Sequence, residues 1–132
     1  MTVVLLDTHP LLWALGRDPR LPEALAERLD ADPSRFLVSD ATLWEIAIKR
    51  STGKITVPDD LPRIVDDLGF GAAPITRRQT WAVRALPFHH RDPFDRLLIS
   101  QARDLRIPVV TADAAFSAYE VQVDWPTSPP AS

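Results

Sequence analysis

The chain has 132 residues, 45% of them hydrophobic and 25% charged, which is the composition of one compact globular domain. Cysteine is absent, which excludes a disulfide framework, a thiolate metal site and a cysteine nucleophile, and the formal net charge of −3 gives no overall positive field for nucleic acid. No apolar run is long enough for a signal-peptide core or a membrane span, so we expect a cytoplasmic protein without a membrane partner.

The predicted elements alternate between short apolar strands and amphipathic helices along the chain. We expect strands at VVLL (3–6), FLV (36–38), AAPI (72–75), IPVV (107–110) and VQV (121–123). We expect helices where apolar residues recur at three- and four-residue steps, at 8–15, 21–29, 41–50, 61–68, 78–86 and 93–105. Because the strands are continuously apolar and helices lie between them, the pattern predicts an α/β fold. Its sheet is expected to be mostly parallel, with about five strands and helices on both faces.

The C-terminal residues WPTSPPAS (125–132) are poor in side chains that could pack against a core. The sequence contains no internal repeat and no low-complexity block that would divide the chain further. We therefore predict a single domain at 1–124 followed by a flexible C-terminal tail at 125–132.

Several acidic residues lie where predicted strands end or predicted helices begin, and each has a structural explanation. Asp7 follows VVLL and can cap the next helix, and Asp113 follows IPVV and can cap the short turn AAFSAY. Glu45 lies within ATLWEIAIKR, where it can form an exposed ion pair with Lys49 one turn later. Taken one at a time, these acids do not decide between structure and chemistry.

Two further aspartates lie in the stretch HHRDPFDRLLISQA (89–102). Asp92 precedes Pro93, a combination that is typical of a helix start, so we expect Asp92 to be the cap. Asp95 lies three residues further on, where the helix dipole also favours an acid. A capped helix that starts at Pro93 would leave Asp95 pointing outward.

The acids are more informative together than separately. In a parallel α/β sheet, the carboxyl ends of the strands and the starts of the following helices share one edge, where ligands bind. Four carboxylates from distant segments are expected to converge there: Asp7, Glu45, Asp95 and Asp113. No lysine stands at an obvious matching position, so a divalent cation is the expected source of positive charge. An all-oxygen ligand set suits Mg²⁺, or Mn²⁺ as a substitute, rather than Zn²⁺.

Four segments, in this order, resemble those of the PIN-domain ribonucleases, particularly the VapC toxins of bacterial toxin–antitoxin pairs. LLDTHPLLWAL resembles the first-acid motif of that family, SDATLWEIAIK its Ser/Thr-to-Glu helix start, DPFDRLLISQA its third-acid helix and TADAAF its fourth-acid turn. The resemblance spans nearly the whole chain. Carried over residue by residue, it implies a catalytic set with three polar supports: Asp7, Glu45, Asp95 and Asp113, with Thr8, Ser39 and Thr111.

The resemblance also implies a three-layer α/β/α fold, endonucleolytic cleavage of RNA with Mg²⁺, a homodimer, and inhibition by a small cognate antitoxin. Asp7, Asp95 and Asp113 are the expected metal ligands, and Glu45 is expected to orient water or to act as a base. Arg96, beside the third acid, is the expected contact to RNA phosphate.

Two other interpretations remain open from the sequence. One is a phosphohydrolase of related α/β topology, in which an aspartate after the first strand is the nucleophile. The haloacid-dehalogenase pattern requires a second aspartate two residues later, where this chain has His9. The other is a non-catalytic PIN-like interaction module, which would be favoured by the loss of one or more of the four acids. This chain keeps all four.

Overall fold

The computed structural model describes residues 2–89 and 92–126. Within this part of the chain, parallel strands form one sheet in the order β3-β2-β1-β4: β1 (Val4–Leu6), β2 (Phe36–Ser39), β3 (Gly71–Ala73) and β4 (Val109–Val110). The α-helices are α1 (Thr8–Leu15), α2 (Glu23–Ala31), α3 (Asp40–Ser51), α4 (Leu61–Asp67), α5 (Arg77–Ala82) and α6 (Pro93–Leu105). Short 3₁₀ helices complete the fold: η1 (Pro33–Arg35), η2 (Val83–Ala85) and η3 (Ala114–Tyr119).

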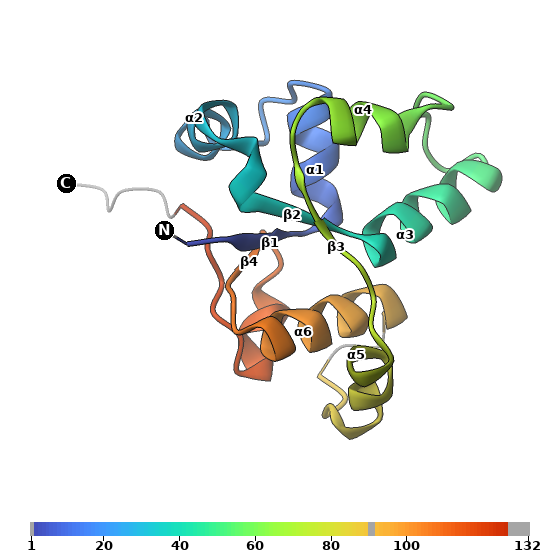
Figure 1. Cartoon of the computed structure of the whole chain (residues 1–132), viewed down its shortest axis with the longest axis vertical. Coiled ribbons are helices and arrows are strands. Elements are labelled where there is room, and N and C mark those ends of the chain that lie inside the picture. Colours follow the sequence, from blue (N-terminus) through green and yellow to red (C-terminus); the bar gives the residue numbers. More distant parts are fainter. Residues whose placement is uncertain (1, 90–91, 127–132) are drawn as a thin grey trace.

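Helices cover the sheet on both faces, which confirms the predicted three-layer α/β/α architecture. Figure 1 shows the sheet near edge-on, with α1, α2 and α4 above it and α5 and α6 below. In β1, Val4 and Leu6 pack into the core under α1 and α2, whereas Leu5 packs into the core beside α6. Because successive side chains of a strand point to opposite faces, burial on both faces requires a continuous apolar run.

The expected strands differ from the structure in extent. The first begins at Val4 instead of residue 3, the second extends to Ser39, and the fourth begins at Val109 instead of residue 107. The third ends at Ala73 because the next residue, Pro74, has no N–H to donate to a sheet. The fifth, at 121–123, reaches β4 through a single parallel bridge between Val109 and Val123, so the sheet of the described residues has four strands.

The packed structure extends slightly past the predicted domain boundary. Trp125, expected to belong to a flexible tail, is partly buried against the core and lies edge-on to Trp13, with ring centroids 6.2 Å apart. The tail residues 127–132 lie outside the described residues. Among the helices that are described, none has both the length and the apolarity needed to cross a membrane.

A buried polar network joins α6 to α5 and to the carboxyl ends of β2 and β3. The side-chain amide of Gln101 donates to the Ala73 carbonyl at 3.2 Å and to the side-chain oxygen of Gln79 at 3.1 Å. The same amide accepts a hydrogen bond from the hydroxyl of Ser39 at the end of β2. These bonds fix the position of α6 relative to the carboxyl ends of β2 and β3, which is the edge where the acids were predicted to meet.

Candidate active site

All four predicted acids line one pocket of ≈ 140 Å³ at the carboxyl edge of the sheet. Its walls are formed by Asp7, Thr8, His9, Trp13, Glu45, Lys49, Asp92, Asp95, Thr111, Ala112 and Asp113. A larger pocket of ≈ 430 Å³ lies among α1, α2 and the loop before β3, and its walls are mainly apolar. The gathering of ionisable groups therefore marks the smaller pocket as the candidate active site.

Asp7 follows β1 and lies at the centre of this arrangement with only 6% of its surface exposed. One carboxylate oxygen accepts the N–H of Thr8 at 2.8 Å, which caps α1, and the other accepts the Thr111 hydroxyl at 2.8 Å. Burial raises the pKa of the Asp7 carboxyl above its ordinary value, and the charge of Glu45 acts in the same direction. The hydrogen bonds from Thr111 and Thr8 partly offset this rise in pKa.

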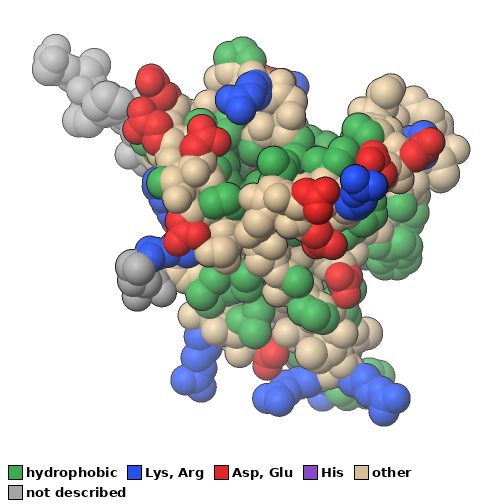
Figure 2. Space-filling model, turned by 45° about the horizontal axis from the view of Figure 1, so that its top comes forward, with side chains coloured by type: hydrophobic (Ala, Val, Ile, Leu, Met, Phe, Trp, Pro, Cys, Tyr) green, Lys and Arg blue, Asp and Glu red, His purple; other side chains and the backbone are tan. Residues whose placement is uncertain are grey.

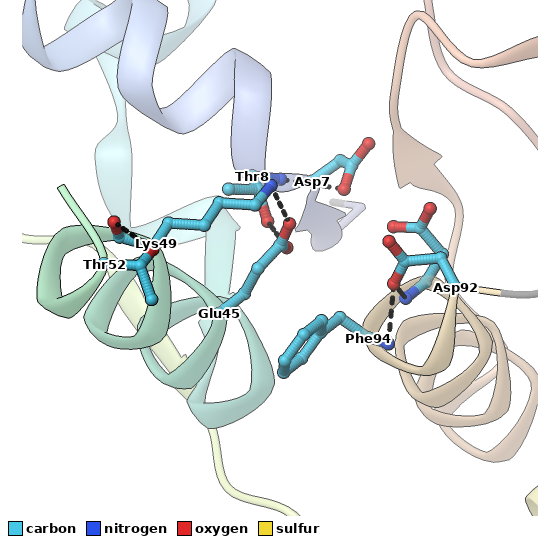
Figure 3. Close-up of polar contacts among 8 residues, drawn as sticks. Asp7, Thr8, Glu45, Lys49, Thr52, Asp92 and Phe94 are labelled. Atoms are coloured by element: carbon cyan, nitrogen blue, oxygen red, sulfur yellow. Dashed lines mark hydrogen bonds and ion pairs between the residues drawn. The ribbon is translucent and has the colours of Figure 1, made fainter. Parts of the chain in front are cut away.

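Glu45 reaches the same pocket from the second turn of α3. Glu45 is only 4% exposed, so the sequence-based expectation that its side chain is exposed is wrong. The expected ion pair with Lys49 is present. The Glu45 carboxylate accepts the Thr8 hydroxyl at 2.7 Å and the Lys49 ammonium at 2.5 Å, and Figure 3 shows these groups together. Thr8 thus links the two acids, because its N–H binds Asp7 and its hydroxyl binds Glu45.

Lys49 is the functional candidate that the sequence analysis missed. The expectation that no lysine matches the acids is wrong, because Lys49 lines the pocket and contacts Glu45. The hydrogen bond to Glu45 raises the pKa of the Lys49 ammonium, and the charges of Glu45, Asp92 and Asp95 add to the effect. Its four-residue spacing from Glu45 was the available signal, since residues one turn apart share a helix face.

The two aspartates at the start of α6 have different contacts. One carboxylate oxygen of Asp92 accepts the N–H groups of Phe94 at 2.8 Å and of Asp95 at 3.1 Å, which confirms Asp92 as the cap. Figure 3 shows the bond to Phe94. Asp95 lies in the first turn, as predicted, and is partly buried. Both aspartates line the pocket, so capping does not remove Asp92 from the site.

The fourth acid is held by the loop after β4. The Thr111 hydroxyl accepts the N–H of Asp113 at 3.0 Å while it donates to Asp7, and the Asp113 carboxylate accepts the N–H of Ala115 at 2.9 Å to cap η3. Thr111 therefore connects the first and fourth predicted acids. The structural explanation of Asp113 as a cap holds together with its place in the pocket.

Two predicted site residues, Ser39 and Arg96, are not among the residues that form the pocket wall. Ser39 caps α3 by accepting the N–H of Ala41 at 2.9 Å and is not part of the pocket wall. Its support of the site is indirect, since it fixes the start of the helix that carries Glu45.

Arg96 is not a contact for RNA phosphate, contrary to the sequence-based expectation. It is 6% exposed, and its guanidinium donates to three backbone carbonyls, those of Pro87 (2.8 Å), Leu86 (3.1 Å) and Val83 (3.2 Å). Successive side chains of an α-helix point in directions about 100° apart. Arg96 therefore points toward η2, whereas Asp95 points into the pocket.

The acids share a pocket without forming a ready-made metal site. Among the residues that the structure describes, no three acidic or histidine side chains are close enough together to act as ligands of one ion. The donors on the described wall are mostly oxygen atoms, from the carboxylates and the two threonine hydroxyls, and His9 adds one imidazole.

Comparison with known proteins identifies the fold. A model of the PIN domain family matches residues 4–122. The chain resembles VapBC2 from Rickettsia felis bound to a promoter DNA fragment, with a TM-score of 0.69 and 15% identity over 94% of this chain and 98% of that chain. It also resembles DNA-bound VapBC from Salmonella typhimurium (TM-score 0.67, 20% identity, 95% and 98% covered). A toxin–antitoxin complex from Klebsiella pneumoniae is similar as well, with a TM-score of 0.63 and 19% identity over 92% of this chain and 95% of that chain. No curated protein sequence matches the chain significantly.

We expect Arg96→Met to destabilise the fold by roughly 2–4 kcal/mol, because it removes the donor from one buried and two part-buried backbone hydrogen bonds. Urea denaturation measures this loss. Arg78→Met is the matched control, since Arg78 is largely exposed and its ion pair with Asp104 is long, at 3.7 Å. Equal unfolding midpoints for the two variants would contradict the structural role of Arg96.

We expect Asp7→Asn to melt no lower than the parent at pH 7.5 in chelator. The pKa of Asp7 is raised in the folded state, so the parent loses stability as pH rises through that raised value, whereas asparagine does not titrate. Any advantage of the variant should therefore shrink as pH falls toward 4. Melting curves at both pH values measure the difference.

Asp18→Asn is the control for this measurement, because the pKa of Asp18 is shifted in the opposite direction from that of Asp7. Hydrogen bonding to Arg20 lowers the pKa of Asp18 to about 2, so loss of this carboxylate should bring no gain at pH 7.5. A large drop in the melting temperature of Asp7→Asn at both pH values would show that its carboxylate stabilises the metal-free fold.

Proposed function

Because this chain belongs to the PIN domain family, we propose that it is a metal-dependent endoribonuclease and the toxin of a toxin–antitoxin pair. The observation that carries this proposal is the meeting of Asp7, Glu45, Asp95 and Asp113, from distant segments, around one pocket. The likeness to a solved toxin–antitoxin complex supports the second part of the proposal.

The residues of the pocket fit Mg²⁺, with Mn²⁺ as a substitute. The described walls carry five carboxylates and one ammonium, and this imbalance favours a bound cation. All of the acidic ligands are oxygen donors, which Mg²⁺ prefers. We assign Asp7, Asp95 and Asp113 as the residues that would hold the ion, which requires their carboxylates to approach one another. When bound, such an ion supplies Lewis-acid stabilisation and lowers the pKa of water.

The reaction is hydrolysis of a phosphodiester. A water oxygen attacks phosphorus, the bond from phosphorus to the leaving ribose oxygen breaks, the proton of the water passes to a base, and the leaving oxygen gains a proton. Glu45 is the proposed residue that orients this water or accepts its proton. Thr8 and Lys49 hold the Glu45 carboxylate in place on the wall of the pocket, beside Asp7.

The same proposal assigns the partners and the location of the protein. The substrate is cellular RNA in the cytoplasm, and a small cognate antitoxin inhibits the toxin by blocking the pocket. A homodimer is the proposed assembly of the toxin. A non-catalytic PIN-like module would bind such partners without cleaving RNA, so a cleavage assay separates the two functions.

The test compares Asp95→Asn with Asp92→Asn on total cellular RNA, in Mg²⁺ and in EDTA. We expect the parent to cleave only in Mg²⁺, and Asp95→Asn to lose cleavage with little change in stability. Asp92→Asn should retain most cleavage, because asparagine also caps helices well. Asp92→Ala should lose about 1 kcal/mol of stability through the lost cap. Fragment gels and thermal melts provide the two readouts.

Three outcomes would count against this account. Equal cleavage by the parent in Mg²⁺ and EDTA would remove the metal. No cleavage by a folded parent would favour the non-catalytic module. Inactivity of a folded Asp92→Asn to the same degree as Asp95→Asn would show that both acids belong to the catalytic set.

A further inference from the structure

A pocket lined by acids repels the polyanion that it is proposed to cleave. The chain carries a net charge of −3, and Arg96 is committed to backbone carbonyls. Figure 2 shows Lys and Arg side chains spread along the lower edge of the molecule, where α5 lies in Figure 1. The exposed Arg77 and Arg78 begin α5 and are not part of the walls of the pocket. Phosphate at the reaction centre therefore needs a different cation.

Lys49 is the one lysine or arginine among the described residues that form the pocket wall. Its side chain is 34% exposed, whereas the side chain of Glu45 is 6% exposed, so the ammonium lies on the solvent side of the carboxylate that it contacts. Figure 3 shows the lysine extended along α3 toward Thr8 and Glu45. This placement puts a positive charge at the rim of the pocket, where a substrate must enter.

The ammonium has donors to spare for a ligand. An ammonium carries three N–H donors, and Glu45 accepts one of them at 2.5 Å. The contact with Glu45 holds the flexible lysine stem in one direction, which reduces the entropy lost when a phosphate binds. A fixed positive group beside the reacting phosphoryl oxygens also stabilises the charge that develops on them in the transition state.

We propose that Lys49 binds the scissile phosphate of the RNA substrate, with Glu45 holding its ammonium at the rim of the acid pocket. This inference rests on the proposed ribonuclease function and adds a substrate-binding residue to it. The alternative is that Lys49 only positions Glu45. The two roles differ in the absence of metal, because a phosphate contact strengthens RNA binding whether or not the reaction can proceed.

The experiment uses the full chain and a mixed-sequence single-stranded RNA oligonucleotide. Binding is measured by fluorescence anisotropy in EDTA over a range of salt concentrations, and kcat/KM is measured in Mg²⁺. For Lys49→Met we expect a slope of log affinity against log salt that is smaller by about 0.7, as for one lost phosphate contact on a single strand. We also expect kcat/KM to fall by roughly 10²–10³-fold, and Lys49→Arg to keep the parent slope.

Arg50→Met is the matched control. It removes one positive charge from the next position of α3, but Arg50 pairs with Asp59 and lies outside the acid pocket. Its slope and kcat/KM should equal those of the parent. If Lys49→Met melts well below the parent, Lys49→Gln repeats the measurement with a neutral side chain that can still donate to Glu45.

The results separate the inference from the function on which it rests. A folded parent that cleaves no RNA in Mg²⁺ overturns the ribonuclease function. A parent that cleaves, with Lys49→Met equal to it in slope and in kcat/KM, overturns the role of Lys49 alone. Loss of cleavage by Lys49→Met with an unchanged salt slope would also overturn the phosphate contact, because it would show that Lys49 acts only through Glu45.

Discussion

The site depends on the common direction of the strands. Because β1, β2 and β4 run parallel, their carboxyl ends and the starts of the following helices lie at one edge of the sheet. The bond from the Thr111 hydroxyl to Asp7 joins two of these ends directly, at 2.8 Å. Thr8 extends the link to Glu45 on α3. Residues that are far apart in the sequence are thereby held around a single pocket, and any change in strand register would separate them.

At this edge of the sheet, an aspartate can cap a helix and also line the pocket. Asp7, Asp92 and Asp113 each accept backbone N–H groups at the start of a helix or turn, and each also lines the pocket. The positive ends of the helices lower the cost of placing like charges close together. The Lys49 ammonium compensates part of the remaining negative charge in the protein itself. The pocket can therefore fold with its acids in place before any ligand binds.

Local sequence patterns predicted the fold and the positions of the acids well. Continuous apolar strands indicated a sheet buried on both faces, and the Asp-Pro pair indicated the start of α6. Side-chain direction was harder to predict, because it depends on which element packs nearby. Arg96 follows a predicted acid, yet η2 covers it, so neighbouring positions in the sequence have unrelated environments. The spacing of Lys49 from Glu45 predicts an ion pair on an exposed helix face, and only the packed structure shows that this face forms part of the pocket wall. Trp125 looked unattached because its partner, Trp13, is far away in the sequence.

The central claim is that the acids at the carboxyl edge of the sheet act together as one divalent-cation site. Paramagnetic broadening of backbone amide NMR signals by Mn²⁺ tests this claim most directly, since the effect falls steeply with distance from the ion. The account predicts that signals of Asp7, Glu45, Asp95 and Asp113 broaden first at low Mn²⁺, and that excess Mg²⁺ restores them. Broadening that begins at exposed acids outside the pocket, such as Asp59 and Asp60, and spares these four would contradict it.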